Sequence, residues 1–395
     1  MDFSLNSKQL LARDEFREFA AAEIAPHAGV FDREERLPAE LIEKLATHEL
    51  LGTIIPRDMD GRGLDMVTYG VLNEEIGRCC SSVRSLLTVH DMVSHTIVRW
   101  GSETQKRKWL PLLASGNIIG ALAVSEPTTG SDLSHVQTTA ISANGSYILQ
   151  GTKKWISFGQ IAGLFLVLAR CEGKPTAFLI ERDRPGVSIE PISGILGVRA
   201  SMLAQINFAD CEIPGSNVIG RIGWGIHSSI STALSLGRYG VAWGCVGIAQ
   251  ACLDASLAYA NERRQFGANL KQHQLIKQLL SDMFTNVSAA RLLCLQAGQM
   301  KDASDPHEVM QTFVAKYFAS RTAMSAATDA VQIHGANGCS SDYPVERYFR
   351  DAKIMEIIEG SNQMQQLTIA DYAYQQWNLA QQQAPRSIGE VEYAG

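Results

Sequence analysis

The chain has 395 residues, of which 46% are hydrophobic and 19% are charged, a balance typical of a globular protein with a large buried core. Its formal net charge of −6 argues against nucleic acid as a partner, although a local basic patch could still hold an anionic ligand. A chain of this length exceeds what one hydrophobic core usually supports, so two or three cooperating domains are expected.

The N-terminus and the cysteines both indicate a reducing compartment. Residues 1–16 are amphipathic and charged, unlike a signal peptide, and no uninterrupted apolar run approaches the roughly 20 residues that span a bilayer. Eight cysteines are scattered without a CxxC pair, which favours buried, reduced thiols over a disulfide framework or a zinc site. We therefore expect a cytoplasmic protein without a membrane partner or a bound metal.

Residues 1–119 have the periodicity of helices. Apolar residues recur three and four positions apart, as in the stripe of Leu41, Ile42, Leu45 and Ala46. Proline and glycine residues interrupt the pattern at intervals. This segment is predicted to form an N-terminal helical domain.

At about Gly120 the pattern changes to that of short strands. Apolar runs at 147–149, 164–169 and 176–180 are bounded by turn residues, and polar and apolar residues alternate over 205–208. No helical pattern intervenes between these runs, so residues 120–227 are predicted to form a middle β domain and not a βαβ sheet.

Residues 228–380 return to a helical composition rich in Ala, Leu, Ser and Gln. Long helices are expected over 228–262, 270–300 and 307–334, and a last one after Ser361. Small residues between 237 and 260 would let these helices approach closely in a C-terminal bundle. Residues 381–395 are predicted to be a polar tail with little order.

Glu359 is the first candidate for chemistry. It follows the apolar residues Met355, Ile357 and Ile358 and precedes Gly360. A carboxylate among aliphatic side chains is poorly solvated, so its pKa rises and it becomes a useful base near neutral pH. Glycine next to it permits a tight turn and the close approach of another molecule. The alternative is a helix-end glutamate with one side in solvent.

Two motifs in the β segment could hold a ligand. The segment VSEPTTGSD at 124–132 offers hydroxyl and N–H donors that suit a planar, acceptor-rich ligand or a phosphate. In GTKKWIS at 151–157, Trp155 could cover an aromatic ring and Ser157 offers a hydroxyl donor. The structural alternatives are a capped loop and a tryptophan packed in the core.

Two further motifs lie in the helical C-terminal part. Arginine in RRQFG at 263–267, at a helix end near a glycine, could clamp a pyrophosphate, or it could end a solvated helix. In VQIHGANG at 331–338, two glycines permit a ligand to approach the backbone. His334 in this motif is expected to be packed or hydrogen-bonded and not catalytic.

In this order and at these separations, the four motifs and Glu359 resemble the acyl-CoA dehydrogenase family over about residues 5–375. The resemblance implies a mainly α fold with a central β domain: an N-terminal helical domain, a β-barrel-like middle domain and a C-terminal four-helix bundle. It also implies non-covalent FAD and a homodimer or homotetramer, in which the neighbouring subunit holds part of the adenine half of the flavin.

Carried over position by position, the resemblance implies both a cofactor site and a substrate site. The flavin would be lined by Val124, Ser125, Gly130, Ser131, Trp155, Ser157, Ser361 and Gln363. Arg263 and Phe266 would reach the adenosine diphosphate half across the subunit contact, and Gln332 and Gly335 would cradle the pyrophosphate. Ser131 would also lie near the acyl carrier arm, and the substrate would contact Arg238, Ile358 and Gly360. Ser157 and Ser361 stand where threonine is common in the family, and Ala336 where glycine is frequent.

The implied reaction begins when Glu359 removes a proton α to a thioester carbonyl, while the β hydrogen leaves as hydride to the flavin. Hydrogen bonds from the Glu359 backbone N–H and a flavin hydroxyl would stabilise the developing enolate. Either an electron-transfer flavoprotein or oxygen could accept the electrons.

The acyl group is predicted from two segments, RYGVAWGCVG at 238–247 and RDAKIMEIIEGS at 350–361. They are similar to dehydrogenases that make hydroxymalonyl- and methoxymalonyl-acyl carrier protein extender units for polyketides. That branch implies a short polar acyl thioester on an acyl carrier protein, oxidised at C3. The alternatives are a short-chain or dicarboxylic acyl-CoA dehydrogenase and a non-catalytic, FAD-stabilised interaction protein, which the intact Glu359 disfavours.

The segment SVRS at 82–85 is similar to glutaryl-CoA dehydrogenase, which places an arginine there against a substrate carboxylate. We therefore expect Arg84 and Thr88 to bind a polar acyl end. The alternative is a structural salt bridge between Arg84 and Glu74 or Glu75.

Overall fold

The computed structural model describes residues 3–383. Before Gly120 its regular elements are helical, as predicted. Asn6 and Ser102 begin α1 and α6 with capping boxes, in which side chain and backbone satisfy each other's free donors. The helices are α1 (Ser7–Phe19), α2 (Ala28–Glu34), α3 (Ala39–Thr47), α4 (Met66–Cys79), α5 (Ser81–Trp100) and α6 (Glu103–Ala114).

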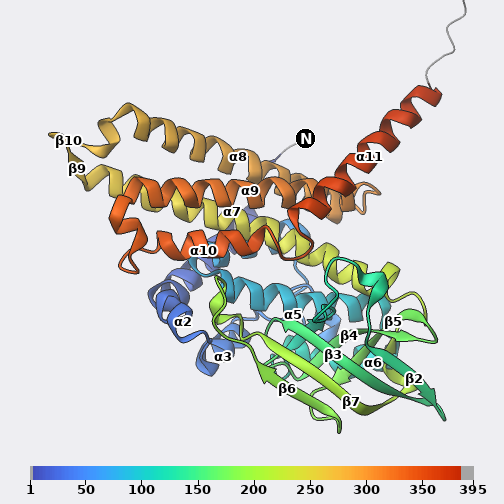
Figure 1. The fold of residues 1–395 in the computed structure, drawn as a ribbon. Coiled ribbons are helices and arrows are strands. Elements are labelled where there is room, and N and C mark those ends of the chain that lie inside the picture. The colour runs from blue at the N-terminus through green and yellow to red at the C-terminus, as the bar shows by residue number, and fades with distance from the viewer. Residues whose placement is uncertain (1–2, 384–395) are drawn as a thin grey trace, which may run out of the picture.

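The middle part is an eight-stranded sheet with the order β6-β7-β3-β2-β4-β5-β8, and β1 lies beside β4 (Figure 1). Most neighbours are antiparallel, but β4 pairs in parallel with both β1 and β2. The strands are β1 (Gly120–Ala123), β2 (Thr139–Ala143), β3 (Ser146–Ile156), β4 (Leu164–Cys171), β5 (Lys174–Glu181), β6 (Val187–Pro191), β7 (Ala204–Pro214) and β8 (Val218–Ile219).

Helices return after the sheet, close to the predicted positions. A π-helical turn (Ile226–Ile230) leads into α7, and a small hairpin of β9 (Arg264–Gln265) and β10 (Ala268–Asn269) follows it. The helices are α7 (Ser231–Glu262), α8 (Gln274–Asp302), α9 (Glu308–His334), α10 (Val345–Met355) and α11 (Asn362–Gln383). The sequence did not predict α10. The predicted tail begins too early, because α11 continues through Gln383, and residues 384–395 lie outside the described residues.

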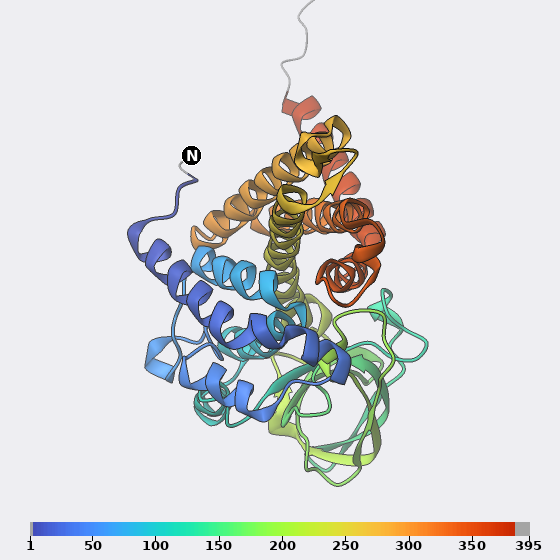
Figure 2. The same ribbon diagram turned by 90° about the vertical axis from the view of Figure 1, so that its left-hand side faces the viewer.

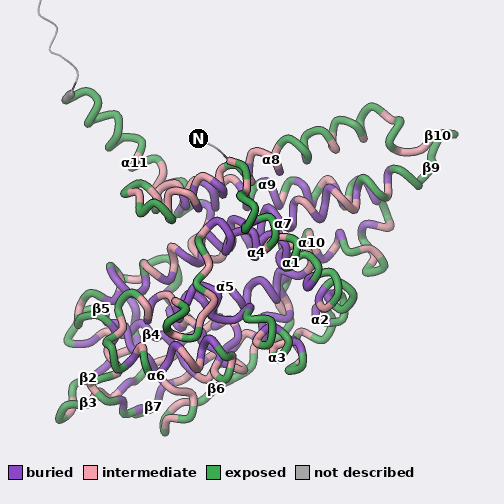
Figure 3. The backbone as a smooth tube through the Cα atoms, turned by 180° about the vertical axis from the view of Figure 1, so that it is seen from behind, coloured by how far each residue is buried: buried purple, intermediate pink, exposed green. Residues whose placement is uncertain are grey.

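Helix α7 is the central element of the fold. It packs against α4, α5, α8, α9 and α10, and Figure 2 shows it as the olive helix between the N-terminal helices and the rest of the bundle. With the preceding turn it is long and apolar enough by composition to cross a bilayer, but 72% of its most apolar stretch is buried inside the fold. Its apolar side chains therefore form the protein core, which Figure 3 shows as the purple interior.

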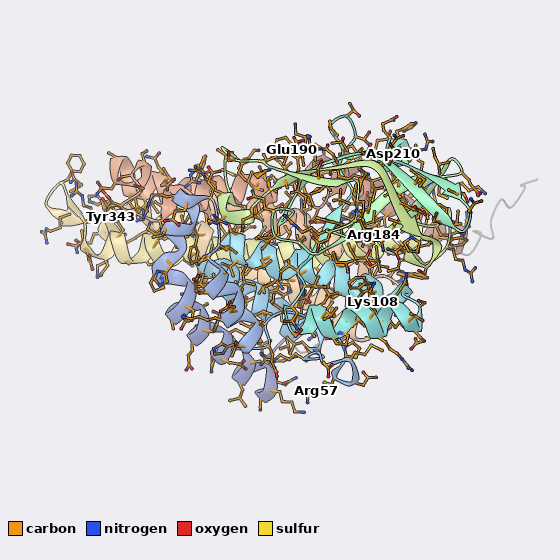
Figure 4. All side chains as sticks on the ribbon, turned by 90° about the horizontal axis from the view of Figure 1, so that it is seen from below. Arg57, Lys108, Arg184, Glu190, Asp210 and Tyr343 are labelled. Atoms are coloured by element: carbon orange, nitrogen blue, oxygen red, sulfur yellow. The ribbon has the colours of Figure 1, made fainter. Side chains whose placement is uncertain are left out.

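The sheet is also tied to the helices by charge. Lys108 of α6 lies 2.9 Å from one oxygen of Glu181 at the end of β5, and Arg184 lies 2.5 Å from the other. Figure 4 labels Lys108 and Arg184. Burial alone would raise the pKa of Glu181, but the hydrogen bonds from Arg184 and Lys108 lower it to about 2. The carboxylate therefore stays ionised and joins the two layers.

Candidate active site

A cavity of about 660 Å³ lies where α5, the β1–β2 loop, β3, α7 and the segment after α10 meet. Apolar side chains form much of its wall, and a few polar groups converge on it, as in many small-molecule sites. Most of the predicted site residues line this cavity: Arg84, Thr88, Val124, Ser125, Gly130, Ser131, Trp155, Ser157, Arg238, Ile358, Glu359, Gly360 and Ser361.

Glu359 lies in the turn between α10 and α11, where the residue is half-buried. Its Oε2 atom is inaccessible to solvent and has no hydrogen-bond partner among the described residues. Burial raises the pKa of Glu359 above its ordinary value, while the charges of Arg238, Arg84 and Lys316 oppose this rise. The alternative of a solvated helix-end glutamate is therefore wrong.

The backbone around Glu359 is strained and firmly held. Glu359 and Gly360 have φ angles of 56° and 88°, a left-handed conformation that costs a non-glycine residue free energy. The Glu359 carbonyl accepts hydrogen bonds from Arg238 Nε at 3.0 Å and Gln365 Nε2 at 3.3 Å. The Gly360 carbonyl accepts from Gln365 Nε2 at 3.0 Å and Lys316 Nζ at 2.9 Å. These contacts fix the direction in which the glutamate points.

Sequence reasoning missed Lys316 and Gln365. One signal was present for Lys316, since it falls on the same helical face as the small buried residues Thr312, Ala319 and Ala323. A lysine within such a stripe is seldom buried unless it has a specific partner. Gln365 gave no comparable signal, because glutamines are common throughout its segment.

Arg84 is a buried cation without a carboxylate partner among the described residues. The residue is 1% exposed. Its Nη1 donates to Thr88 Oγ1 at 3.2 Å, its Nη2 lies 3.5 Å from Met355 Sδ, and its Nε has no partner. Thr88 Oγ1 lies 2.9 Å from the buried Asn73 Oδ1, a residue that sequence reasoning also missed.

The alternative structural salt bridge for Arg84 is wrong. Glu74 pairs instead with Arg291 at 2.6 Å, and Glu75 pairs with Arg17 at 2.7 Å. Both carboxylates therefore already have partners, and Arg84 faces the cavity with donors that the described protein groups only partly satisfy.

Glycines of α7 make room for the groups on this wall of the cavity. A Cβ on Gly237 would lie 2.8 Å from Glu359 Oε2, and one on Gly244 would lie 2.9 Å from Arg84 Nε. Both distances are shorter than a carbon atom normally tolerates. The close approach of helices that the sequence predicted therefore also provides space for the two charged side chains.

The residues that the sheet and its loops contribute to the cavity fit a planar aromatic cofactor. Trp155 lies at an irregularity in the β3–β7 register, with a φ angle of 64°. It is 52% exposed and lines the cavity, so it is not a core tryptophan. The hydroxyls of Ser125, Ser131 and Ser157 lie on the same cavity. A ring face beside several hydrogen-bond donors is what an isoalloxazine ring requires.

A buried ion pair supports the 124–132 loop, and sequence reasoning missed it. Lys153 Nζ lies 2.7 Å from Glu126 Oε1 and 3.1 Å from the Val124 carbonyl. Both charged side chains are almost wholly buried, and Glu126 also accepts from the Thr138 hydroxyl at 2.6 Å. The pair fixes the loop whose hydroxyls line the cavity.

Other predicted cofactor residues do not line this cavity within one chain. Arg263 and Phe266 lie at the β9–β10 hairpin, at the far end of the bundle from the sheet (Figure 1), and Phe266 is 97% exposed. Gln332 and Gly335 lie at the end of α9, and Gln363 lines a separate hollow of about 360 Å³. The contact of Arg263 and Phe266 with the cofactor across the subunit boundary stays a prediction, and so does the contact of Gln332, Gly335 and Gln363 with the cofactor.

His334 is packed, as expected. It is buried, its Nδ1 lies 2.7 Å from the Ala330 carbonyl, and its ring stacks on Tyr259 at 4.2 Å.

Six of the eight cysteines are buried, Cys79 is half-buried and Cys339 is exposed.

Comparisons with known families and proteins agree with this geometry. Three family models match, the N-terminal, middle and C-terminal domains of acyl-CoA dehydrogenases, over residues 6–117, 121–211 and 223–373. An acyl-CoA dehydrogenase of Bacillus subtilis is 38% identical over 93% of this chain and 98% of its own length. A short-chain specific acyl-CoA dehydrogenase of Clostridium acetobutylicum is 36% identical over 94% and 99%.

Solved structures have the same fold. Butyryl-CoA dehydrogenase of Megasphaera elsdenii matches with a TM-score of 0.91 and 32% identity, over 95% of this chain and 100% of that one. A glutaryl-CoA dehydrogenase of Mycobacterium smegmatis in complex with FADH2 has a TM-score of 0.89 at 28% identity, over 93% and 95%.

Two further similar structures have carrier-protein or polyketide descriptions. The prolyl acyl carrier protein oxidase AnaB has a TM-score of 0.90 at 26% identity, over 94% of this chain and 100% of that one. FkbI, described for biosynthesis of a methoxymalonyl extender unit, has a TM-score of 0.84 at 30% identity, over 92% and 99%. The chain belongs to the acyl-CoA dehydrogenase family, whose members are FAD-dependent oxidoreductases that act on CH–CH bonds.

Proposed function

We propose that this protein oxidises a short acyl thioester whose distal end bears a carboxylate or another strong hydrogen-bond acceptor. The observation that supports this is the guanidinium of Arg84, which is buried at the cavity wall without a carboxylate partner among the described residues. A buried charge without a partner is costly, so a ligand group that pairs with it gains substantial binding free energy.

In this proposal Glu359 is the base. Its buried carboxylate has a raised pKa and faces the cavity, so it can accept the proton from the carbon α to the thioester carbonyl. Arg238, Arg84 and Lys316 keep a share of it ionised, which a base requires. FAD, when bound, supplies the acceptor for the hydride that leaves the β carbon.

The remaining residues bind and orient. Trp155 and Ser157, with Ser125 and Ser131, would hold the flavin ring, since they line the same cavity as Glu359. Thr88 orients Arg84 through the hydrogen bond at 3.2 Å. The apolar side chains around them exclude water, which strengthens each polar contact inside the cavity.

For the carrier of the acyl group, we propose an acyl carrier protein in polyketide extender-unit biosynthesis. The descriptions of AnaB and FkbI support this choice. A short-chain or dicarboxylic acyl-CoA is the second candidate, favoured by the Clostridium and Megasphaera relatives. Turnover of one acyl group presented on carrier protein and on CoA separates the two, because the true carrier should give the higher kcat/KM.

We further propose a homodimer or homotetramer in the cytoplasm. Exposed apolar side chains on α8 and on α11, a helix that Figure 3 shows mostly in green, support a contact between copies: Leu275, Phe284, Leu367, Tyr374 and Trp377. Light scattering of the purified protein gives its mass directly, and a monomer at working concentration contradicts the proposal.

The Arg84→Met variant tests the polar acyl end while keeping most of the side-chain volume. On glutaryl-CoA, whose acyl end is a carboxylate, kcat/KM should fall about 100-fold, because a buried charge pair is lost. On butyryl-CoA, which has no such group, kcat/KM should change far less. Equal losses on both thioesters would show that Arg84 acts on the fold and not on the substrate.

A further inference from the structure

Lys316 is a second buried cation close to Glu359, and the sequence analysis did not single it out. It projects from the middle of α9 and is 0% exposed. Its Nζ donates to the Gly360 carbonyl at 2.9 Å and to Asn362 Oδ1 at 3.3 Å. Among the described residues it forms no ion pair with a carboxylate, so its charge is balanced mainly by these two oxygens.

The two groups that Lys316 contacts lie on either side of the turn that follows Glu359. Asn362 begins α11, its backbone N–H donates to the Glu356 carbonyl at 2.9 Å, and its Oδ1 also accepts from Ser320 Oγ at 2.9 Å. Ser320 lies one helical turn after Lys316 on α9. Two side chains of α9 thus hold the turn.

This support explains why a strained turn persists. Consecutive left-handed residues at Glu359 and Gly360 remain only where their surroundings fix them. Arg238 holds the first carbonyl from α7, Gln365 holds both from α11, and Lys316 holds the second from α9. Two of these three residues, Arg238 and Lys316, are cations, and Lys316 brings its charge to the turn from α9.

We propose that Lys316 is a positioning residue for the base: through the Gly360 carbonyl it fixes the turn so that the Glu359 carboxylate points into the cavity, and its positive charge favours the ionised carboxylate. This inference rests on the assignment of Glu359 as the base. The new element is that a residue of α9, on the side of the cavity away from the sheet, controls both the direction and the protonation of the Glu359 carboxylate.

The charged groups around Lys316 determine the pH range in which Lys316 is protonated and in which Glu359 is ionised. Burial lowers the pKa of Lys316 to about 8; Cys245 from α7 and Glu359 and Glu356 from the turn raise it, and Arg238 from α7 lowers it. The ammonium therefore stays charged at neutral pH. Its charge in turn opposes the burial that raises the pKa of Glu359, so removal of this charge should raise the Glu359 pKa further.

The variants Lys316→Met, Lys316→Gln and Thr312→Val test the proposal in the FAD-loaded protein. Thr312 lies one turn before Lys316, is equally buried, and donates only to the Glu308 carbonyl at 2.8 Å. It is thus a matched control for the loss of a buried polar group from α9. With butyryl-CoA as the probe, kcat is measured against pH for each protein.

In Lys316→Met, kcat should fall about 100-fold because the base is misplaced, and the acidic limb of the pH profile should move to higher pH. Lys316→Gln keeps an N–H donor without the charge, so it should recover part of kcat while the limb stays displaced. Thr312→Val should match the wild type in both measurements. A wild-type kcat and limb in Lys316→Met, or equal changes in Thr312→Val, would overturn the proposal.

Hydrogen exchange of the backbone amides in 356–361 provides a readout that needs no substrate. Exchange should be faster in Lys316→Met than in Thr312→Val, and unchanged exchange contradicts the role in holding the turn. If Lys316→Met does not fold, Ser320→Ala, which loosens Asn362 without removing a charge, should show faster exchange and a smaller loss of kcat, with the acidic limb unmoved. Glu359→Gln separates the two assignments: if it stays active, the base assignment fails, whereas an inactive Glu359→Gln beside a wild-type-like Lys316→Met removes only the role of Lys316.

Discussion

At the scale of single residues, several charged or ionisable groups are buried beside the cavity or behind it. Asp91 of α5 is wholly buried; its Oδ2 accepts from Thr53 Oγ1 at 2.7 Å, and its Oδ1 has no partner among the described residues. Burial raises the pKa of Asp91 to about 7, against the hydrogen bond from Thr53 that lowers it. A carboxyl group in this setting is more stable when protonated.

Asp91 therefore predicts a pH dependence of stability. In the unfolded chain the carboxyl has its ordinary pKa, so between that value and about 7 the folded protein binds more protons than the unfolded one. Its contribution to stability is complete below the unfolded pKa and is lost as pH rises through the folded pKa. Asp91→Asn should raise the free energy of unfolding above neutral pH by a few kcal/mol at most.

Denaturant unfolding at acidic and at alkaline pH checks this. The increase in the free energy of unfolding that Asp91→Asn brings should vanish at acidic pH, where Asp91 is protonated in both the folded and the unfolded protein. Asp58→Asn, at an exposed position, serves as the control and should leave the profile unchanged. An Asp91→Asn variant that is equally destabilised at every pH contradicts the account.

At the scale of elements, α7 connects packing with chemistry through its glycines. The Cβ of an alanine at 237 would meet only the flexible ends of Glu359 and Met92, at 2.8 Å each. At 247 it would instead overlap the Glu74 carbonyl oxygen and lie 2.7 Å from the Arg78 backbone N of α4. Flexible ends can move at little cost, whereas the backbone of a packed helix cannot.

Gly237→Ala should consequently lower kcat about 10-fold or more, because the new Cβ displaces the base. Its free energy of unfolding should change by about 1 kcal/mol or less, because alanine favours the helix. Gly247→Ala should lower the free energy of unfolding by about 1–3 kcal/mol through overpacking, with little effect on the kcat of the folded fraction. Steady-state kinetics and denaturant unfolding of both variants check the contrast, and a loss of stability in Gly237→Ala as large as in Gly247→Ala would refute it.

The elements themselves were largely predictable, because their signals are local. The helical periodicity and the turn residues predicted the order of helices, strands and helices, and three of the long C-terminal helices to within a few residues. The parallel pairing of β4 with β1 and β2 was not predictable, since it depends on where distant strands meet.

The same limit applies to the site. Glu359 could be found because it follows an apolar run, and Arg84 because its segment is similar to that of glutaryl-CoA dehydrogenase. The contact of Lys316 with Gly360 joins residues 44 positions apart, and that of Lys153 with Glu126 joins residues 27 positions apart. Such partners are decided by tertiary packing, which no local pattern records.

At the scale of the whole molecule, the cavity depends on how the three parts of the chain meet around α10. Arg350 Nη2 lies 2.6 Å from Asp32 of α2, and its Nη1 lies 3.2 Å from the Leu196 carbonyl of the β6–β7 connection. The neighbouring Asp351 accepts from the Val198 N–H at 2.6 Å. Helix α10 thus ties the N-terminal helices and the sheet to the segment that bears Glu359.

This arrangement places a buried carboxylate on the helical side of the cavity and an exposed tryptophan on the sheet side. In the function proposed above, the space between them holds both the flavin and the thin, activated acyl group. The account depends on Glu359 acting across that space.

Anaerobic addition of butyryl-CoA to the FAD-loaded protein, followed by flavin absorbance, tests this most directly. The wild type should lose its oxidised flavin absorbance. Glu359→Gln should bind FAD with the same stoichiometry but lose absorbance at least about 1000-fold more slowly, because no base removes the α proton. Loss of absorbance at the wild-type rate in Glu359→Gln would contradict the account.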